Sequence, residues 1–491
     1  MNKTKGTSIT SVISASSVGT MIEWYDFYIF GSLATIISTK FFPQDNPTAA
    51  FLSTLATFAA GFVVRPFGAL FFGRLGDLIG RKYTFMVTLL LMGGATFLIG
   101  CIPSYETIGF MAPVLILLLR LLQGLALGGE YGGAATYVAE HSPEGKRGFM
   151  TAWIQTTATV GLFVSLLVIM GTRAALSAED FDAWGWRVPF WVSILMVLVS
   201  YLIRKNMEES PVFAKAKAAG KTSTNPLKES FGKKLNFKFV LLALFGAVMG
   251  QGVIWYTGQF YAMSFIEKTM NVDKEQVDSL MFIALMLGTP FFLVFGWLSD
   301  KIGRKWIMMA GMLIAIVSYR PIYENMYQTT NVANKVELSS SNSMVNNVNT
   351  VTTVYADSTI QQEIQKTNPT NGAITTTIKI SINSNDKQKL ILLVFIQVLF
   401  VTMVYGPIAA FLVEMFPTKI RYTSMSLPYH IGNGVFGGLL PAVATYLATN
   451  AKTAGKTDWY LEGLWYPIGV AAVCLVIGVI YINGKDKEIN D

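Results

Sequence analysis

Long runs of apolar residues, separated by short charged or Pro/Gly-containing breaks, are the main pattern along the 491-residue chain. Met86–Gly100 and Ile391–Val413 are two examples. With their flanks, such runs reach the ~20 residues that cross a bilayer as a helix. The chain is therefore expected to be an all-α membrane protein with twelve transmembrane helices, at 12–38, 50–73, 84–101, 108–139, 149–173, 187–205, 237–266, 277–298, 305–321, 389–414, 423–449 and 463–483.

Composition agrees with the hydropathy pattern. Hydrophobic residues make up 52% of the chain and charged residues only 14%, against about a quarter charged in soluble domains. Two cysteines far apart in the sequence, Cys101 and Cys474, encode neither a disulfide framework nor a metal site. No glycine-rich turn has the G-x-x-x-x-G-K-[ST] spacing of a nucleotide-binding loop. We therefore expect no enzyme activity, no catalytic residues, no cofactor, no metal and no nucleic-acid partner.

Basic residues alternate between the predicted loops, and this alternation predicts the orientation. The formal net charge is +8. If the N-terminus is cytoplasmic, the loops rich in Lys and Arg all face the cytoplasm, as the positive-inside rule requires. Glu23 and Asp26 interrupt the first apolar stretch, so it is predicted to be a retained helix and not a signal peptide. We expect a multi-pass protein of the inner cell membrane with both termini in the cytoplasm.

The most basic stretch, 206–236, lies midway through the predicted helices. It is predicted to be a cytoplasmic linker between a six-helix half at 1–205 and a second half at 237–491. Its lysines could bind anionic lipid, but a solvated linker that obeys the positive-inside rule is the favoured interpretation.

Two motifs occur twice, in the same order. G-x-x-x-D-x-x-G-R-K follows the second helix of each half, at Gly73 and Gly296, and E-x-x-P-x-x-x-R follows the fourth, at Glu140 and Glu414. Such repetition indicates duplicated halves. Their glycines permit tight turns and their charges suit a latch that opens and closes. The predicted cytoplasmic gate comprises Gly73, Asp77, Gly80, Arg81, Glu140, Arg147, Asp300, Gly303, Arg304, Glu414 and Arg421.

The second motif is displaced further along the chain than the first, which locates an insertion in the second half at about 323–389. This tract is rich in Thr, Asn and Ser. Thr375–Asn383 alternates like a strand, so a β-hairpin is one interpretation, but a solvated, flexible loop on the outer side is the favoured one. No transport role is assigned to it.

The paired G-x-x-x-D-x-x-G-R-K turns resemble the signature of the major facilitator superfamily, whose members are built from repeated halves. Further motifs are similar to those of its metabolite–proton symporter branch, which includes permeases for α-ketoglutarate, shikimate, citrate and proline or betaine. The insertion departs from the short loop usual in that branch. The matching segments are Glu23-Trp-Tyr-Asp26-Phe, Arg65-Pro-Phe-Gly68, Arg120-Leu-Leu-Gln-Gly124, Gly128-Gly-Glu130-Tyr-Gly-Gly133 and Glu209-Ser-Pro-Val-Phe213.

The resemblance implies alternating access, with helices one, four, seven and ten lining a central cavity. Independently, an ionisable side chain in the hydrocarbon is a functional candidate. Asp26 lies about 20 Å into helix one and Arg120 about as deep in helix four, so the two can pair. We expect proton coupling to involve Asp26 and Arg120, with Glu23 and Glu130 as further candidates, although a static salt bridge is an open alternative. Arg65 is one candidate partner for Glu130.

Gln251, Trp255 and Gln259 recur every four residues on helix seven and share one face. Polar amides and aromatic rings facing a bundle interior suit a small polar solute. His430, in helix eleven, is expected to be a packing residue, because that helix is expected to be peripheral to the cavity. The predicted substrate-binding residues are Arg65, Gln251, Trp255, Tyr256, Gln259 and Tyr405.

Together these observations predict a monomeric secondary transporter that imports a small organic acid or zwitterion by proton symport, with the substrate, protons and the lipid bilayer as its partners. Two alternatives stay open. One is a sugar porter or passive facilitator, and the other is a solute-sensing receptor on a transporter fold, with 323–389 as its outer domain.

Overall fold

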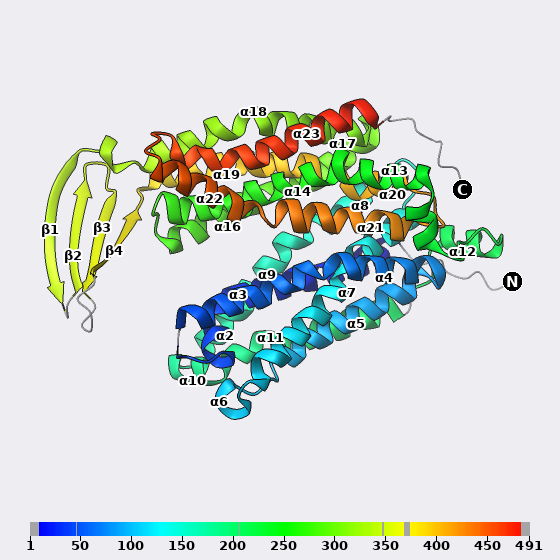
Figure 1. Cartoon of the computed structure of the whole chain (residues 1–491), viewed down its shortest axis with the longest axis horizontal. Coiled ribbons are helices and arrows are strands. Elements are labelled where there is room, and N and C mark those ends of the chain that lie inside the picture. The colour runs from blue at the N-terminus through cyan, green and yellow to red at the C-terminus, as the bar shows by residue number, and fades with distance from the viewer. Residues whose placement is uncertain (1–8, 46, 206, 346–347, 368–373, 483–491) are drawn as a thin grey trace.

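The computed structural model describes residues 9–482, except 46, 206, 346–347 and 368–373. Two helical bundles lie side by side and a sheet projects beyond one end of them (Figure 1). We call this end the sheet end. The opposite end carries the segment that joins the bundles and is called the linker end.

The first bundle contains the helices up to residue 205. Proline at the start of α4 breaks the second membrane helix into α3 and α4, since the ring removes a backbone donor. Its helices are α1 (Ile9–Ser32), α2 (Ala34–Phe41), α3 (Pro47–Val63), α4 (Arg65–Leu78), α5 (Arg81–Ile99), α6 (Tyr105–Ile108), α7 (Met111–His141), α8 (Arg147–Gln155), α9 (Thr157–Ala175), α10 (Ala178–Ala183) and α11 (Val188–Lys205).

The second bundle follows the segment predicted to be a linker, which contains the short helix α12 (Pro211–Ala218). Residue 206, where that predicted linker starts, and the two chain ends lie outside the described residues. The second bundle comprises α13 (Lys234–Ala243), α14 (Met249–Tyr256), α15 (Ala262–Ser264), α16 (Lys274–Gly288), α17 (Pro290–Ile302), α18 (Arg304–Thr330), α19 (Ser384–Tyr405), α20 (Ile408–Met415), α21 (Arg421–Ile431), α22 (Leu440–Thr453) and α23 (Trp465–Tyr481).

Ten stretches of the described residues are long and apolar enough to cross a membrane. The two bent helix pairs at 9–41 and 47–78 provide the other two of the twelve membrane helices. Large apolar side chains such as Phe67, Leu118 and Val317 are exposed on the outside, while Asp26, Arg120 and Glu130 are buried. Apolar surface outside and polar groups inside are what a lipid environment requires.

The prediction of a flexible loop at 323–389 is wrong. Helix α18 continues to Thr330, α19 begins at Ser384, and described residues between them form a four-stranded antiparallel sheet in the order β1-β2-β3-β4. Runs of Val, Ile and Thr favour extended backbone, and each strand finds a partner in its neighbour. The strands are β1 (Glu337–Val345), β2 (Val348–Tyr355), β3 (Ile360–Thr367) and β4 (Ile374–Ser381).

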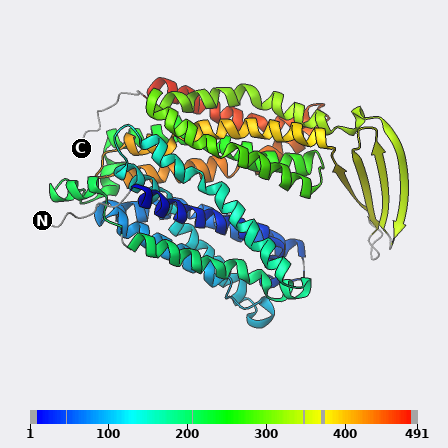
Figure 2. The same ribbon diagram turned by 180° about the vertical axis from the view of Figure 1, so that it is seen from behind.

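Strand β4 attaches the sheet to the helices. Ile380 donates a backbone hydrogen bond to the Asn271 carbonyl and accepts one from the Asp273 amide. Strands β3, β2 and β1 follow in order, so β1 is the strand furthest from the bundle, as Figures 1 and 2 show from opposite sides. All nine residues of β1 are exposed.

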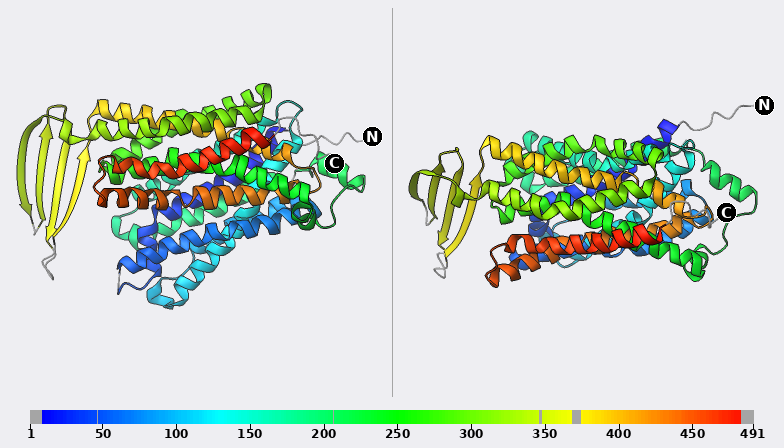
Figure 3. Two further views of the ribbon diagram at one scale, coloured as in Figure 1. Left: turned by 45° about the horizontal axis from the view of Figure 1, so that its top comes forward. Right: turned by 90° about the horizontal axis from the view of Figure 1, so that it is seen from above.

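The two bundles converge toward the linker end, where α4 packs on α21 and α8 packs on α17. Glycine permits this approach: a Cβ atom on Gly73 would lie 2.9 Å from the Thr423 Cα, and one on Gly296 would lie 2.7 Å from the Gly148 carbonyl oxygen. Figure 3 shows the bundles from two further directions, with the sheet beyond one end of them in both views. The repeated motif therefore sits where the two halves touch.

Candidate functional site

Helix α1 carries two buried carboxylates, and each pairs with a different arginine. The expected ion pair between Asp26 and Arg120 is present, with 3.3 Å between Oδ2 and Nη1. Arg120 also donates to Gln123 Oε1 at 2.5 Å, and Gln123 donates in turn to Thr96. This network joins α1, α5 and α7 inside the first half.

Glu23 pairs with Arg65 of α4, with 3.4 Å between Oε1 and Nη1. The Arg65 guanidinium also lies over the Phe62 ring, 4.3 Å from its centroid. Glu23 and Arg65 belong to the lining of a cavity between the two halves. Asp26 and Arg120 do not, so the two ion pairs have different access to a solute.

The suggestion that Arg65 is the partner of Glu130 is wrong. Glu130 Oε1 accepts from Arg204 Nη2 at 2.7 Å, and its Oε2 accepts from Thr88 at 2.8 Å. Arg204 further donates to the carbonyls of Ala15 and Phe85. Depth along the helix allowed both partners, but the buried α11 arginine is the one in contact.

The second half contributes aromatic walls to the cavity. Trp255 and Tyr256 of α14 face it, and Trp255 meets Trp24 of α1 with 5.0 Å between ring centroids. Tyr405, at the end of α19, shares a 2.6 Å hydrogen bond with Tyr429. The cavity is lined by Glu23, Trp24, Phe62, Arg65, Trp255, Tyr256, Tyr405, Tyr429, His430, Asn433 and Gly434.

The two predicted helix-seven amides lie outside this lining. Gln251 exchanges hydrogen bonds with Asn433 at 3.1 and 3.3 Å, and so holds α14 against helix eleven. In the structure, helix eleven consists of α21, a π-helical turn and α22. Gln259 is buried and is likewise absent from the residues that line the cavity. Of the six predicted substrate-binding residues, the structure therefore gathers Arg65, Trp255, Tyr256 and Tyr405.

Helix eleven was expected to be peripheral, and this expectation is wrong. Tyr429, His430 and Asn433 line the cavity. Tyr429 and His430 lie at the end of α21, and Asn433 lies in the π-helical turn Gly432–Gly437 that follows. A Cβ on Gly252 would lie 2.6 Å from the Gly432 carbonyl oxygen, so α14 and helix eleven are in backbone contact. Tyr429 also stacks on Tyr131 of α7, with ring centroids 3.6 Å apart. The glycines of these two helices are the sequence feature that could have predicted this contact.

The predicted gate residues gather in two clusters at the linker end. In the Asp77 cluster (Asp77, Arg81, Glu140, Arg421), Asp77 forms an ion pair with Arg81 at 3.0 Å and Glu140 accepts from Arg421 at 2.9 Å. Asp77 also accepts from the backbone amides of Tyr422 and Thr423 at 3.3 and 2.8 Å. These amides open α21, so Asp77 of the first half caps a helix of the second.

The Asp300 cluster (Asp300, Arg304, Glu414, Arg147) repeats this arrangement with the halves exchanged. Asp300 accepts from the Gly148 and Phe149 amides, both at 2.8 Å, and so caps α8 of the first half. Arg304 donates to Asp300 at 2.7 Å and to Glu414 at 2.8 Å. Gly80 and Gly303 adopt positive φ angles of 137° and 98° at the corresponding turns, where other residues would be strained.

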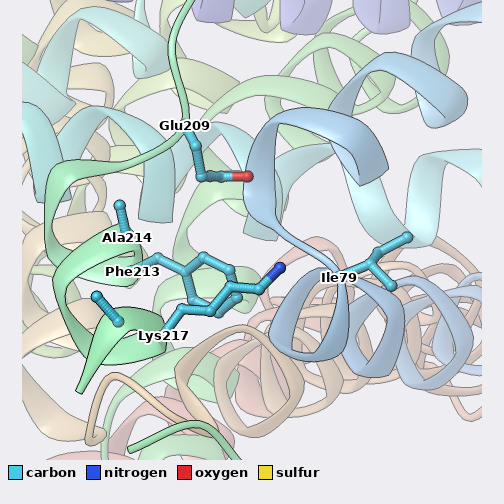
Figure 4. A pocket seen from close by; sticks show the side chains of 6 residues that line it. Ile79, Glu209, Phe213, Ala214 and Lys217 are labelled. Atoms are coloured by element: carbon cyan, nitrogen blue, oxygen red, sulfur yellow. The ribbon is translucent and has the colours of Figure 1, made fainter. Parts of the chain in front are cut away.

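A second hollow lies at the linker end, between the end of α4 and α12 (Figure 4). Ile79, Glu209, Phe213 and Lys217 line it. Glu209 accepts from the backbone amides of Arg81 and Lys82 at 3.1 and 3.3 Å, and so caps α5. This hollow is where the connecting segment seats on the first half, and it is separate from the cavity between the halves.

Comparison with known proteins agrees with this architecture. The family described as "Sugar (and other) transporter" matches residues 12–238. The chain is 32% identical over 483 residues to the inner membrane metabolite transport protein YhjE of Escherichia coli (96% of this chain, 94% of the relative). It is 30% identical over 484 residues to the proline/betaine transporter of the same organism (96% and 83%), and 28% identical over 485 residues to its alpha-ketoglutarate permease (98% and 95%).

Among solved structures, the proton:xylose symporter XylE aligns with a TM-score of 0.69 over 96% of this chain and 94% of its own, at 14% identity. That symporter is a member of the major facilitator superfamily. The chain belongs to the major facilitator superfamily, in its branch of metabolite permeases. It is a multi-pass membrane transporter and not an enzyme.

Proposed function

We propose that this transporter imports a small zwitterion that carries a carboxylate, together with protons, by alternating access. The observation that carries the proposal is the Glu23–Arg65 pair on the wall of a cavity that is otherwise mostly aromatic. Relatives named as transporters of proline and betaine, both zwitterions, agree with this substrate class.

The charges of the cavity favour a zwitterion over a dianion. Arg65 is its one guanidinium and Glu23 its one carboxylate among the lining residues. A buried charge is tolerated when it is paired, so Arg65 can accept one substrate carboxylate, whereas a second carboxylate would find no further cation among the lining residues. The rings of Trp24, Trp255 and Tyr256 can hold the cationic part of the solute through cation–π contact.

The same pair supplies a route to proton coupling. In the empty cavity Glu23 neutralises Arg65. When a substrate carboxylate binds Arg65, Glu23 loses its partner and is left as a buried, unpaired acid that gains from binding a proton. Asp26, on the same helix as Glu23 and paired with Arg120 of α7, is a second buried carboxylate through which the proton can pass.

The clusters at the linker end support alternating access. Both join a helix of one half to an acid of the other, so they hold the linker end closed and must separate when it opens. We place this end and both termini in the cytoplasm, because the connecting segment is strongly basic. The sheet then lies on the outer side.

The test is uptake by proteoliposomes of the purified full chain under an imposed pH gradient, acid outside. Labelled proline and glycine betaine should accumulate, and a protonophore should abolish the accumulation. Accumulation that ignores the protonophore would refute proton coupling, and uptake of xylose in place of both zwitterions would favour a sugar porter. Replacing 337–381 by a short Gly/Ser linker should leave uptake intact, whereas its loss would favour a sensing role for the sheet.

Asp26→Asn separates coupling from binding. The amide keeps the size of the side chain and one acceptor but does not titrate, so gradient-driven accumulation should be lost while counterflow exchange persists. Asp182→Asn is the matched control, because Asp182 is an exposed residue that pairs with Lys40 at the sheet end. If Asp26→Asn still accumulated the substrate fully, the coupled proton would have to bind another carboxylate, Glu23 or Glu130.

A further inference from the structure

Most polar groups around the cavity between the halves already bond to one another. Glu23 pairs with Arg65, Gln251 with Asn433, and Tyr405 with Tyr429. A small set of polar atoms in this region has no such partner. Among the described residues, three buried nitrogens of cavity-lining side chains have no hydrogen-bond partner: Arg65 Nε, Trp255 Nε1 and His430 Nε2.

Unpartnered buried nitrogens are informative because nearly all buried polar groups in proteins are hydrogen-bonded. His430 and Trp255 are each 3% exposed, so bulk water does not satisfy them. They come from two adjacent helices of the second half, helix eleven and α14, and both line one cavity. In a transporter, the group that completes such a set is the solute.

The chemistry of the three nitrogens differs. Arg65 Nε and Trp255 Nε1 are donors only, so they match a carboxylate. A neutral imidazole has one nitrogen that accepts a hydrogen bond. It shares the cavity with the cationic Arg65, and a substrate ammonium brings a further positive charge, so His430 serves best as a neutral acceptor for an ammonium N–H.

We infer that His430 and Trp255 hydrogen-bond the transported zwitterion, and that His430 selects solutes with an N–H group beside the carboxylate over fully N-methylated ones. This inference rests on the proposed function and narrows its substrate class. His430 thus becomes a specificity-determining residue instead of a packing residue.

A graded ligand series tests it: L-proline, N-methylproline and N,N-dimethylproline, which carry two, one and no ammonium N–H groups. Equilibrium binding to the purified full chain, measured by calorimetry, needs no proton gradient. Affinity should fall along the series by about ten- to hundredfold in total, the usual effect of losing a hydrogen bond to a charged group. His430→Phe should flatten the series, and His430→Gln, which keeps an acceptor, should restore part of it.

The second histidine of the chain provides the control. His141, at the linker end of α7, bonds the Tyr137 carbonyl, so His141→Phe should leave the series unchanged. Because the chain has only two histidines, His141→Asn labelled with ¹⁵N-histidine reports on His430 alone. Its imidazole signal should shift with proline and shift less with N,N-dimethylproline, a readout that does not depend on His430→Phe folding.

The outcomes are separable. A flat series in the natural chain, or a series of equal slope in His430→Phe, would overturn the role of His430 while binding itself upholds the proposed substrate class. Binding of none of the three by the natural chain would refute the zwitterion proposal and this inference together.

Discussion

The Asp77 and Asp300 clusters have the same residue types and the same connections, yet they lie in different surroundings. The side chains of Asp77, Arg81 and Glu140 are 0% exposed. In the other cluster, Arg147 and Glu414 are 33% and 34% exposed. Sequence repetition alone would suggest two equivalent contacts.

The connecting segment accounts for the difference. Ser210 donates to Glu140, and the Phe213 ring packs against the Arg81 guanidinium, with the carbon centre 4.2 Å from the ring centroid. Glu209 caps α5 directly beside them. This covering removes water from the Asp77 cluster, so its ion pairs are unscreened and costly to break singly. We infer that the Asp77 cluster contributes most of the free energy that keeps the linker end closed, and that the Asp300 cluster contributes less.

Replacing the two capping acids should give the largest contrast. Asp77→Ala leaves Arg81 buried beside one carboxylate fewer and should destabilise the closed linker end by about 3–5 kcal/mol. Asp300→Ala should cost about 1–2 kcal/mol, the usual loss for a helix cap. Thermal unfolding and initial uptake rates of both variants, with Asp182→Ala as control, measure the difference. Equal losses would show that burial does not distinguish the clusters.

The inter-half ion pairs should differ in coupling energy and in salt dependence. A double-mutant cycle on Glu140–Arg421 should give about 2 kcal/mol, and one on Glu414–Arg147 about 0.5 kcal/mol, because the second pair is partly in water. Raising the ionic strength from about 0.05 to 0.5 M should reduce only the second value. Stability in detergent provides the measurement, and two salt-independent couplings of similar size would contradict the comparison.

Removing the cover should make the first cluster resemble the second. Glu209→Gln weakens the cap on α5 and should destabilise the protein by about 0.5–1 kcal/mol. It should also introduce salt dependence into the Glu140–Arg421 coupling, measured in the same double-mutant cycle. Glu144→Gln, a change at an exposed position of the adjacent turn, is the matched control. A Glu140–Arg421 coupling that stays insensitive to salt would show that the connecting segment does not shield the cluster.

The base of the sheet offers a third, more exposed cluster, which should show the smallest effect. Lys335 donates to Asp357 and, at 2.6 Å, to Asp386. Burial acts to raise the pKa of Asp357, but the hydrogen bonds from Lys335 and Thr359 outweigh it and lower the pKa below its usual value. The stabilisation is therefore present above the ordinary Asp pKa of about 3.9 and is lost as the pH falls through the lower folded value.

Limited proteolysis of the sheet between pH 7 and 3 checks this expectation. Cleavage should increase only below about pH 4, and Lys335→Met should remove the dependence. An unchanged pH profile in Lys335→Met would assign the transition to other groups.

Several features of the protein could be predicted from the sequence because they depend only on positions along the chain. Apolar run length specifies a membrane helix, so twelve membrane helices and a mostly helical fold were predictable. Equal depth along two helices was enough to pair Asp26 with Arg120. The recurrence of G-x-x-x-D-x-x-G-R-K likewise predicted two related clusters, because repeated sequence folds into repeated structure.

The rest depended on the rotation of helices about their axes and on contacts between distant segments. Depth left Glu130 with more than one possible partner, and only packing brings Arg204 to it. Helix eleven turned out to line the cavity because its glycines let it touch α14, a contact that lies outside any one helix's pattern. The insertion folds because each strand completes its neighbour's hydrogen bonds. The two repeated motifs differ in burial because the connecting segment covers only the first, and its Glu209 bonds the Arg81 amide from 128 residues away in the chain.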